Sequence, residues 1–103
     1  MKLEFFESDI LLMKSAYIKY GEAAEVGVAV EECAELIVAL QKYINRSKSP
    51  ESIDNILDEI ADVEIMLASM RLMLEIDCET LRQRIDYKLD RLRSRMAVKD
   101  CHD

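Results

Sequence analysis

The scarcity of glycine and proline is the feature that most constrains this chain. Only two Gly and one Pro occur in 103 residues, of which half are hydrophobic. A fold of many short strands needs such residues at its turns, so the composition favours a few long helices. The length suits one domain. We therefore expect a single all-α domain over residues 1–103.

Apolar periodicity and helix-end signals divide the chain into four expected helices. The first covers 8–20, with Ser8 as its N-cap and Gly21 at its end. The second and third cover 22–46 and 50–74, and the pair Ser49-Pro50 starts the third. Asp77 is expected to cap a fourth helix that ends near Met96. Residues 97–103, including His102, are expected to form a poorly ordered tail.

Each of the three later helices carries an apolar seam with steps of three and four residues. The seam residues are Val26, Val30, Cys33, Ile37, Leu40 and Ile44 on the second helix, Ile53, Ile56, Ile60, Val63, Leu67 and Leu74 on the third, and Leu81, Ile85, Leu89, Leu92 and Met96 on the fourth. Cys33 is therefore expected to be a buried thiol. A domain of this size buries limited surface alone, so self-association would help to stabilise it.

The charge and the cysteines limit the partners and the location. A formal net charge of −7 disfavours non-specific binding to nucleic acid. No segment approaches membrane-spanning length, and no leader pattern is present. The three cysteines show no CxxC spacing. We expect a cytoplasmic protein that binds neither nucleic acid nor a membrane.

Two acidic clusters carry the strongest chemical signal. Glu32 and Glu35 lie three residues apart on the second helix, and Glu59 and Asp62 repeat that spacing on the third. A spacing of i, i+3 places both carboxylates of a pair on one helix face. The neighbours of these acids are largely apolar, so partial burial is expected, which is costly for like charges unless they are protonated, paired or metal-bound. Four such oxygens suit a hard divalent cation such as Mg²⁺.

Several other site types lack the residues they need. A di-iron bundle requires Glu-x-x-His on two helices, and the one histidine, His102, lies outside the expected helices. Zinc sites and nucleophilic triads are disfavoured for the same reason. No glycine-rich phosphate loop is present.

The two acidic motifs together resemble those of the MazG-like, all-α nucleoside triphosphate pyrophosphohydrolases, and in particular their short single-domain branch. That superfamily has EExxE, a variable spacer and ExxD. Here Glu31-Glu32-x-x-Glu35 is followed after 23 residues by Glu59-x-x-Asp62. The strings ECAELI after Glu31, EIADV from Glu59 and YKLDRL from Tyr87 are similar to that branch as well. The resemblance extends over about residues 20–96.

The resemblance implies a four-helix, MazG-like bundle completed by oligomerisation, as a homodimer or homotetramer. It implies Mg²⁺-dependent cleavage of (deoxy)nucleoside triphosphates to monophosphate and pyrophosphate, with Mn²⁺ as a substitute metal. The metal ligands would be Glu32, Glu35, Glu59 and Asp62, with Glu31 orienting water and Glu35 also catalytic. Lys42, seven residues beyond Glu35, and Lys88 and Arg91 on the fourth helix are the candidate phosphate-binding cations.

Two other functions remain open from the sequence. A phosphoribosyl-ATP pyrophosphohydrolase would use the same metal chemistry on another substrate. A non-catalytic helical oligomer that binds a cation for stability would show the same acidic pattern without turnover.

Overall fold

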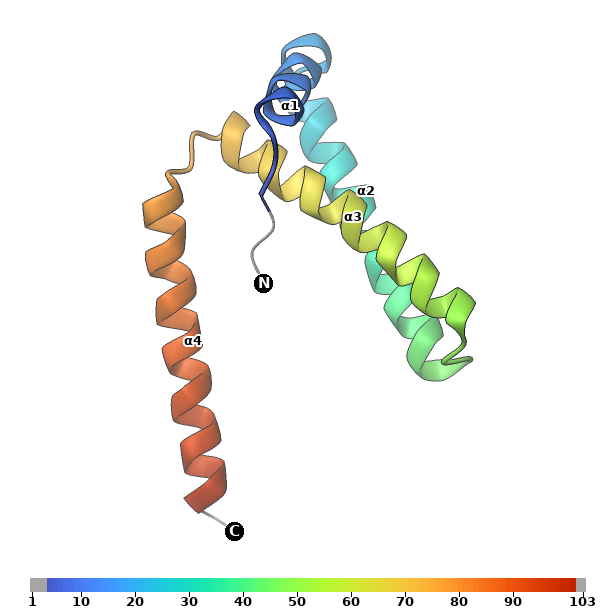
Figure 1. The fold of residues 1–103 in the computed structure, drawn as a ribbon, viewed down its shortest axis with the longest axis vertical. Coiled ribbons are helices and arrows are strands. Elements are labelled where there is room, and N and C mark those ends of the chain that lie inside the picture. Colours follow the sequence, from blue (N-terminus) through green and yellow to red (C-terminus); the bar gives the residue numbers. More distant parts are fainter. Residues whose placement is uncertain (1–3, 102–103) are drawn as a thin grey trace.

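Four α-helices joined by short connections make up the computed structural model, which describes residues 4–101 and the side chains of 4–98 (Figure 1). The helices are α1 (Glu7–Tyr20), α2 (Glu22–Asn45), α3 (Pro50–Met73) and α4 (Cys78–Cys101). The described part contains no strand, which confirms the all-α class. No helix in this part is both long enough and apolar enough to cross a membrane.

Local capping chemistry sets most helix ends where the sequence predicts them. Gly21 has φ +89°, a conformation that favours glycine; its N–H donates to the Tyr17 carbonyl (3.0 Å), and its carbonyl accepts from Glu25 (3.1 Å). One glycine thus ends α1 and starts α2. The Ser49 hydroxyl accepts from the Ser52 N–H at 3.1 Å, and the Asp77 carboxylate accepts from the Thr80 N–H at 3.2 Å.

Two helix ends differ from the sequence prediction. Ser8 is not the cap of α1, because the helix begins at Glu7 and the Asp9 carboxylate accepts from the Phe6 N–H at 2.9 Å. At the other end, α4 continues to Cys101 rather than stopping near Met96. No Gly or Pro interrupts the sequence there, so nothing ends the helix earlier. The rest of the expected tail, including His102, lies outside the described residues.

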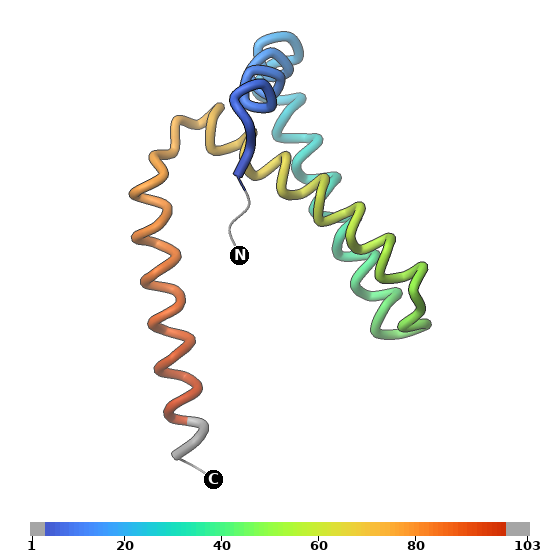
Figure 2. Tube along the Cα trace, viewed as in Figure 1, coloured from blue at the N-terminus to red at the C-terminus, as the bar shows by residue number. Residues whose placement is uncertain are grey.

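Helices α2 and α3 form an antiparallel hairpin that makes the main contact of the fold, and α1 packs across both at one end (Figure 1). The buried apolar residues are two methionines and two alanines among the described residues: Met13 of α1, Ala39 of α2, and Met66 and Ala68 of α3. Among the described residues α4 contacts none of the other helices, and its trace runs away from them (Figure 2). The molecule is therefore extended, about 55 × 36 × 25 Å.

Most residues of the expected apolar seams are exposed in the described part of the chain, although Ile56, Val63 and Leu81 are half-buried. On α2, Val30 and Ile44 are each 65% exposed, and Cys33 is exposed too. The prediction that Cys33 is buried is therefore wrong for the single chain. The reason is that α3 lies against the face of α2 that carries the acids, so that the neighbouring apolar face stays open.

The two glycines offer a matched test of the helix-end analysis. Gly21→Ala should lower the free energy of unfolding by roughly 1–3 kcal/mol, because a Cβ is strained at this positive φ. Gly27→Ala should instead raise it by roughly 0.5–1 kcal/mol, because Gly27 lies inside α2 with nothing within 4 Å of an added Cβ. Urea denaturation followed by circular dichroism measures both. Equal effects from the two changes would contradict the role given to Gly21.

Candidate metal centre

The four predicted carboxylates meet where α2 and α3 touch. Glu32 and Glu35 project from α2, and Glu59 and Asp62 project from α3. One carboxylate oxygen from each residue can be chosen so that all four lie within 4.8 Å of one another. The prediction that these two helices are neighbours with converging acids is thus confirmed.

Burial divides the four acids into two kinds. Glu32 and Glu59 are half-buried, and one carboxylate oxygen of each is shielded from solvent without a hydrogen-bond partner. Glu35 and Asp62 are exposed. Partial burial was expected for all four, so the prediction is confirmed for two and wrong for the others. A buried oxygen without a donor is costly, which marks the two inner carboxylates as places where a cation would be stabilising.

The pKa values of the inner pair are raised. Desolvation is the largest cause for Glu32, followed by a side-chain hydrogen bond with Asp62 and the negative charges of Asp62, Glu35 and Glu59. Desolvation also comes first in raising the pKa of Glu59, followed by the charges of Glu35 and Asp62. All of these causes disfavour the ionised form. Without a cation, Glu32 and Glu59 therefore retain their protons to higher pH than an ordinary glutamate does.

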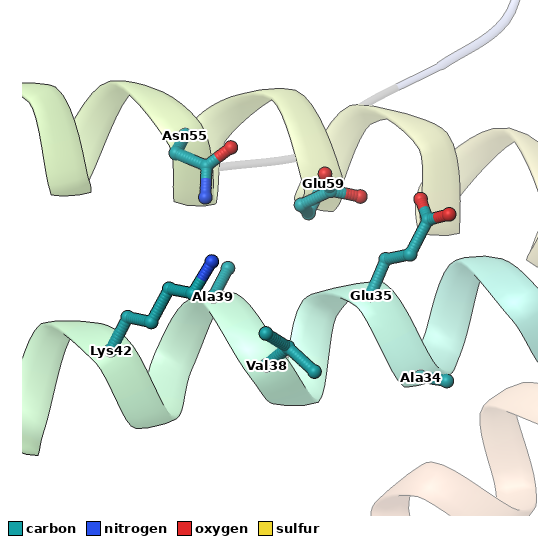
Figure 3. A pocket seen from close by; sticks show the side chains of 7 residues that line it. All are labelled: Ala34, Glu35, Val38, Ala39, Lys42, Asn55 and Glu59. Atoms are coloured by element: carbon teal, nitrogen blue, oxygen red, sulfur yellow. The ribbon is translucent and has the colours of Figure 1, made fainter.

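A groove continues from the cluster along the same helix pair. Its volume is about 340 Å³, and Glu35 and Glu59 lie at one end. Lys42 of α2 and Asn55 of α3 reach toward each other across the other end (Figure 3). Lys42 lies seven residues beyond Glu35, which predicts a shared helix face, and both residues line the groove. Asn55 was given no role from the sequence, although the i, i+4 spacing from Asn55 to Glu59 was a usable signal.

The remaining candidate residues are not part of this cluster. Glu31 is exposed and lies outside the group of four converging oxygens. Lys88 and Arg91 belong to α4, which contacts neither α2 nor α3 in the part of the chain that is described. These two cations therefore do not reach the carboxylates within one chain. Spacing along a helix cannot reveal this, because it contains no information on where that helix docks.

The donor set fits a hard divalent cation. Oxygens on opposite sides of Mg²⁺ lie about 4.2 Å apart, and those on opposite sides of Ca²⁺ about 5 Å apart. The four carboxylate oxygens lie within 4.8 Å of one another, so small side-chain adjustments would bring them to the spacing of either ion. No Lys or Arg forms an ion pair with any of the four acids among the described residues. Within the described part of the chain, the four acids therefore have no basic side chain paired with them.

No protein-family model, no curated protein and no solved structure matches this chain.

The raised pKa values predict how the metal-free protein responds to pH. The pKa of Glu59 is higher in the folded state than its ordinary value of 4.5. Protonation of this carboxyl therefore stabilises the fold at pH values below 4.5, and the stabilisation is lost as the pH rises through the raised pKa. In EDTA, Glu59→Gln should therefore have a Tm close to that of wild type near pH 4.5 and a higher Tm near pH 7. Mg²⁺ should raise the Tm of wild type more than that of the variant.

Differential scanning fluorimetry across this pH range measures both effects. Asp54→Asn is the matched control, because Asp54 is an exposed acid of α3 outside the cluster. A Tm difference between wild type and Glu59→Gln that does not change with pH would contradict the raised pKa of Glu59.

Proposed function

We propose that this protein is a Mg²⁺-dependent nucleotide pyrophosphohydrolase that splits (deoxy)nucleoside triphosphates into monophosphate and pyrophosphate. One observation carries the proposal: four carboxylates from α2 and α3 converge within 4.8 Å beside a groove that contains Lys42. An acidic cluster attracts a cation, and the adjacent amine suits the anionic group that such a cation binds. Polyphosphates combine with Mg²⁺ in this way.

The cluster favours a catalytic cation over a purely structural one. Structural sites tend to enclose their ion, whereas Mg²⁺ in phosphate chemistry is held by a few carboxylates and keeps positions for substrate oxygens and water. Here the shielded oxygens of Glu32 and Glu59 form the inner side, and Glu35 and Asp62 are open to solvent. A substrate can approach from that open side. This supports the enzyme over the non-catalytic cation-binding oligomer.

The proposed chemistry assigns a role to each residue. Glu32, Glu35, Glu59 and Asp62 would hold the ion, for which Mn²⁺ is a substitute. When bound, Mg²⁺ supplies positive charge that neutralises phosphate oxygens and lowers the pKa of water. Glu35 would accept the proton of the water that adds across the α–β phosphoanhydride, and Glu31 would orient that water from the rim.

The motif resemblance supports the same reaction without naming a substrate. Glu31-Glu32-x-x-Glu35 and Glu59-x-x-Asp62 match the MazG-like pattern, and we propose membership of that superfamily, with action in the cytoplasm. The base and the sugar are not specified by the groove residues. Phosphoribosyl-ATP thus stays a second candidate substrate, because its hydrolysis needs the same metal chemistry.

A nucleotide panel tests the proposal. Purified protein with Mg²⁺ should release pyrophosphate from at least one nucleoside triphosphate or from phosphoribosyl-ATP, as measured by a coupled pyrophosphate assay and chromatography of the monophosphate. Glu35→Gln and Asp62→Asn should each lower kcat/KM on the order of 100-fold or more, because each removes a proposed metal ligand.

The control for these variants is again Asp54→Asn, which should retain wild-type turnover. Release that survives Glu35→Gln or Asp62→Asn would contradict the site. Absence of release from every substrate would favour the cation-binding scaffold.

Lys42 provides a separate test of the groove. Lys42→Met should raise KM about tenfold, in line with the loss of one charge-assisted hydrogen bond to a phosphate, and leave kcat less affected. Lys48→Met is the matched control, because Lys48 lies over the ring of Tyr43 and is not among the groove residues. Steady-state kinetics separates the two parameters. A KM equal to that of wild type would remove Lys42 from the substrate site.

A further inference from the structure

A second cavity adjoins the groove beside the four acids. Its volume is about 290 Å³, and it lies along the last turns of α2. Val38 and Lys42 line both the groove and this cavity, so the two are continuous with each other. The other residues of its lining are Gln41, Asn45 and Arg46. Among the described residues, the lining therefore contains two cations and two amides but no acid.

The segment that forms this cavity differs in charge from the rest of the chain. Residues 36–50 contain no Asp or Glu, although 21 of the 103 residues are acidic. No longer stretch of the sequence lacks an acid. The same residues include three cations, Lys42, Arg46 and Lys48, which give the segment a local charge of +3 in a chain with a net charge of −7. A basic segment of this kind favours an anionic ligand.

Helix geometry places Arg46 on the same face of α2 as Lys42 and Glu35. At about 100° per residue, the three positions fall within about 40° of one another around the helix. The N–H of Arg46 donates to the Lys42 carbonyl at 3.0 Å, which keeps the helix end in register. The ammonium of Lys42 leans toward the Glu35 end of the groove (Figure 3), as expected for helical side chains, which tilt toward the N-terminus. A row of polar groups therefore leads from the acids to Arg46.

Neither of the two cations has a counter-ion in the described part of the chain. No ion pair and no side-chain hydrogen bond there involves Lys42 or Arg46. Like charges at i, i+4 repel each other. The end of a helix attracts cations, but this attraction does not explain why both share the face of Glu35 and line one cavity. An anion held between them would remove the repulsion.

We propose that Lys42 and Arg46 form an anion subsite for the phosphates beyond the cleaved bond, and that this subsite selects nucleotides by the length of their phosphate chain. The inference rests on the proposed function, which it extends to Arg46. Lys42 lies about 10 Å from Glu35 along the helix axis, and Arg46 about 6 Å further. With the α–β anhydride at the four acids, the β- and γ-phosphates of a triphosphate extend along the groove toward the two cations.

The two cations contribute differently to such a subsite. The planar guanidinium of Arg46 donates two parallel hydrogen bonds to one phosphate, whereas the ammonium of Lys42 acts as a point charge. A nucleoside diphosphate has no γ-phosphate and gives up the contacts with Arg46. Cleavage of the diphosphate at the same anhydride would yield monophosphate and phosphate, and it should be the slower reaction at low substrate concentration.

The first test measures binding without turnover. The Mg²⁺ complexes of inorganic tripolyphosphate and pyrophosphate are titrated into the protein in an isothermal titration calorimeter. Wild type should bind tripolyphosphate at least about tenfold more tightly than pyrophosphate, and Arg46→Met should raise the Kd for tripolyphosphate about tenfold or more. Arg46→Lys should lose less affinity, because it keeps the charge.

The matched control is Lys48→Met, since Lys48 lies over the ring of Tyr43 and lines neither the groove nor the second cavity. This variant should bind both anions as wild type does. Equal affinity of wild type for the two anions, or equal losses in Arg46→Met and Lys48→Met, would overturn the subsite. Circular dichroism spectra like that of wild type show that each variant is folded.

The second test uses the substrate that the nucleotide panel identifies, together with its diphosphate analogue. Wild type should have a kcat/KM at least about tenfold higher for the triphosphate, and Arg46→Met should reduce this ratio, mainly through the KM of the triphosphate. A ratio that Arg46→Met does not change would rule out selection by chain length. If no nucleotide is hydrolysed, the proposed function fails, and the calorimetry still decides whether the subsite exists.

Discussion

Four carboxyl groups at the contact between α2 and α3 govern the rest of this structure. Two packed helices usually place apolar residues along their contact, but here Glu32 and Glu59 occupy part of it and each keeps a shielded oxygen without a donor. The resulting repulsion is relieved by protons or by a cation. Because the acids take up the face between the helices, the apolar seams are turned outward. The packing that brings the four acids together therefore also leaves apolar residues of α2 and α3 exposed in the described part of the chain.

Much of this arrangement could be predicted from sequence because it depends on local chemistry. A positive φ at Gly21, the hydroxyl of Ser49 and the carboxylate of Asp77 end or start helices through hydrogen bonds within a few residues. The spacing from Glu32 to Glu35 fixes a shared face by helix geometry alone. The short connection between α2 and α3 then requires the two helices to be neighbours, which brings the second acidic pair into reach.

The incorrect predictions concern where faces are buried. Periodicity predicts that the apolar seam of α2 is buried, but it does not identify the segment that covers the seam. Cys33 was therefore expected to be buried within the chain, whereas it is exposed. Lys88 and Arg91 stay predictions, because α4 contacts neither α2 nor α3 within the described part of one chain and a site built from two copies is not tested by that. Asn55 was missed although it lies four residues before Glu59, and its position across the groove from Lys42 depends on how α2 and α3 pack.

Helix α4 gains no stability from packing against the other helices in the described part of the chain. An isolated helix in water is only marginally stable, and most helical stability in proteins comes from packing of an amphipathic face. The ion pairs within α4 add little, since the side chains of Arg82 and Asp86 are 58% and 60% exposed and exposed pairs contribute about 0–1 kcal/mol each. Burial of the apolar residues of α4 would add about 25 cal/mol per Å², so the stability of this helix is limited for as long as they are exposed.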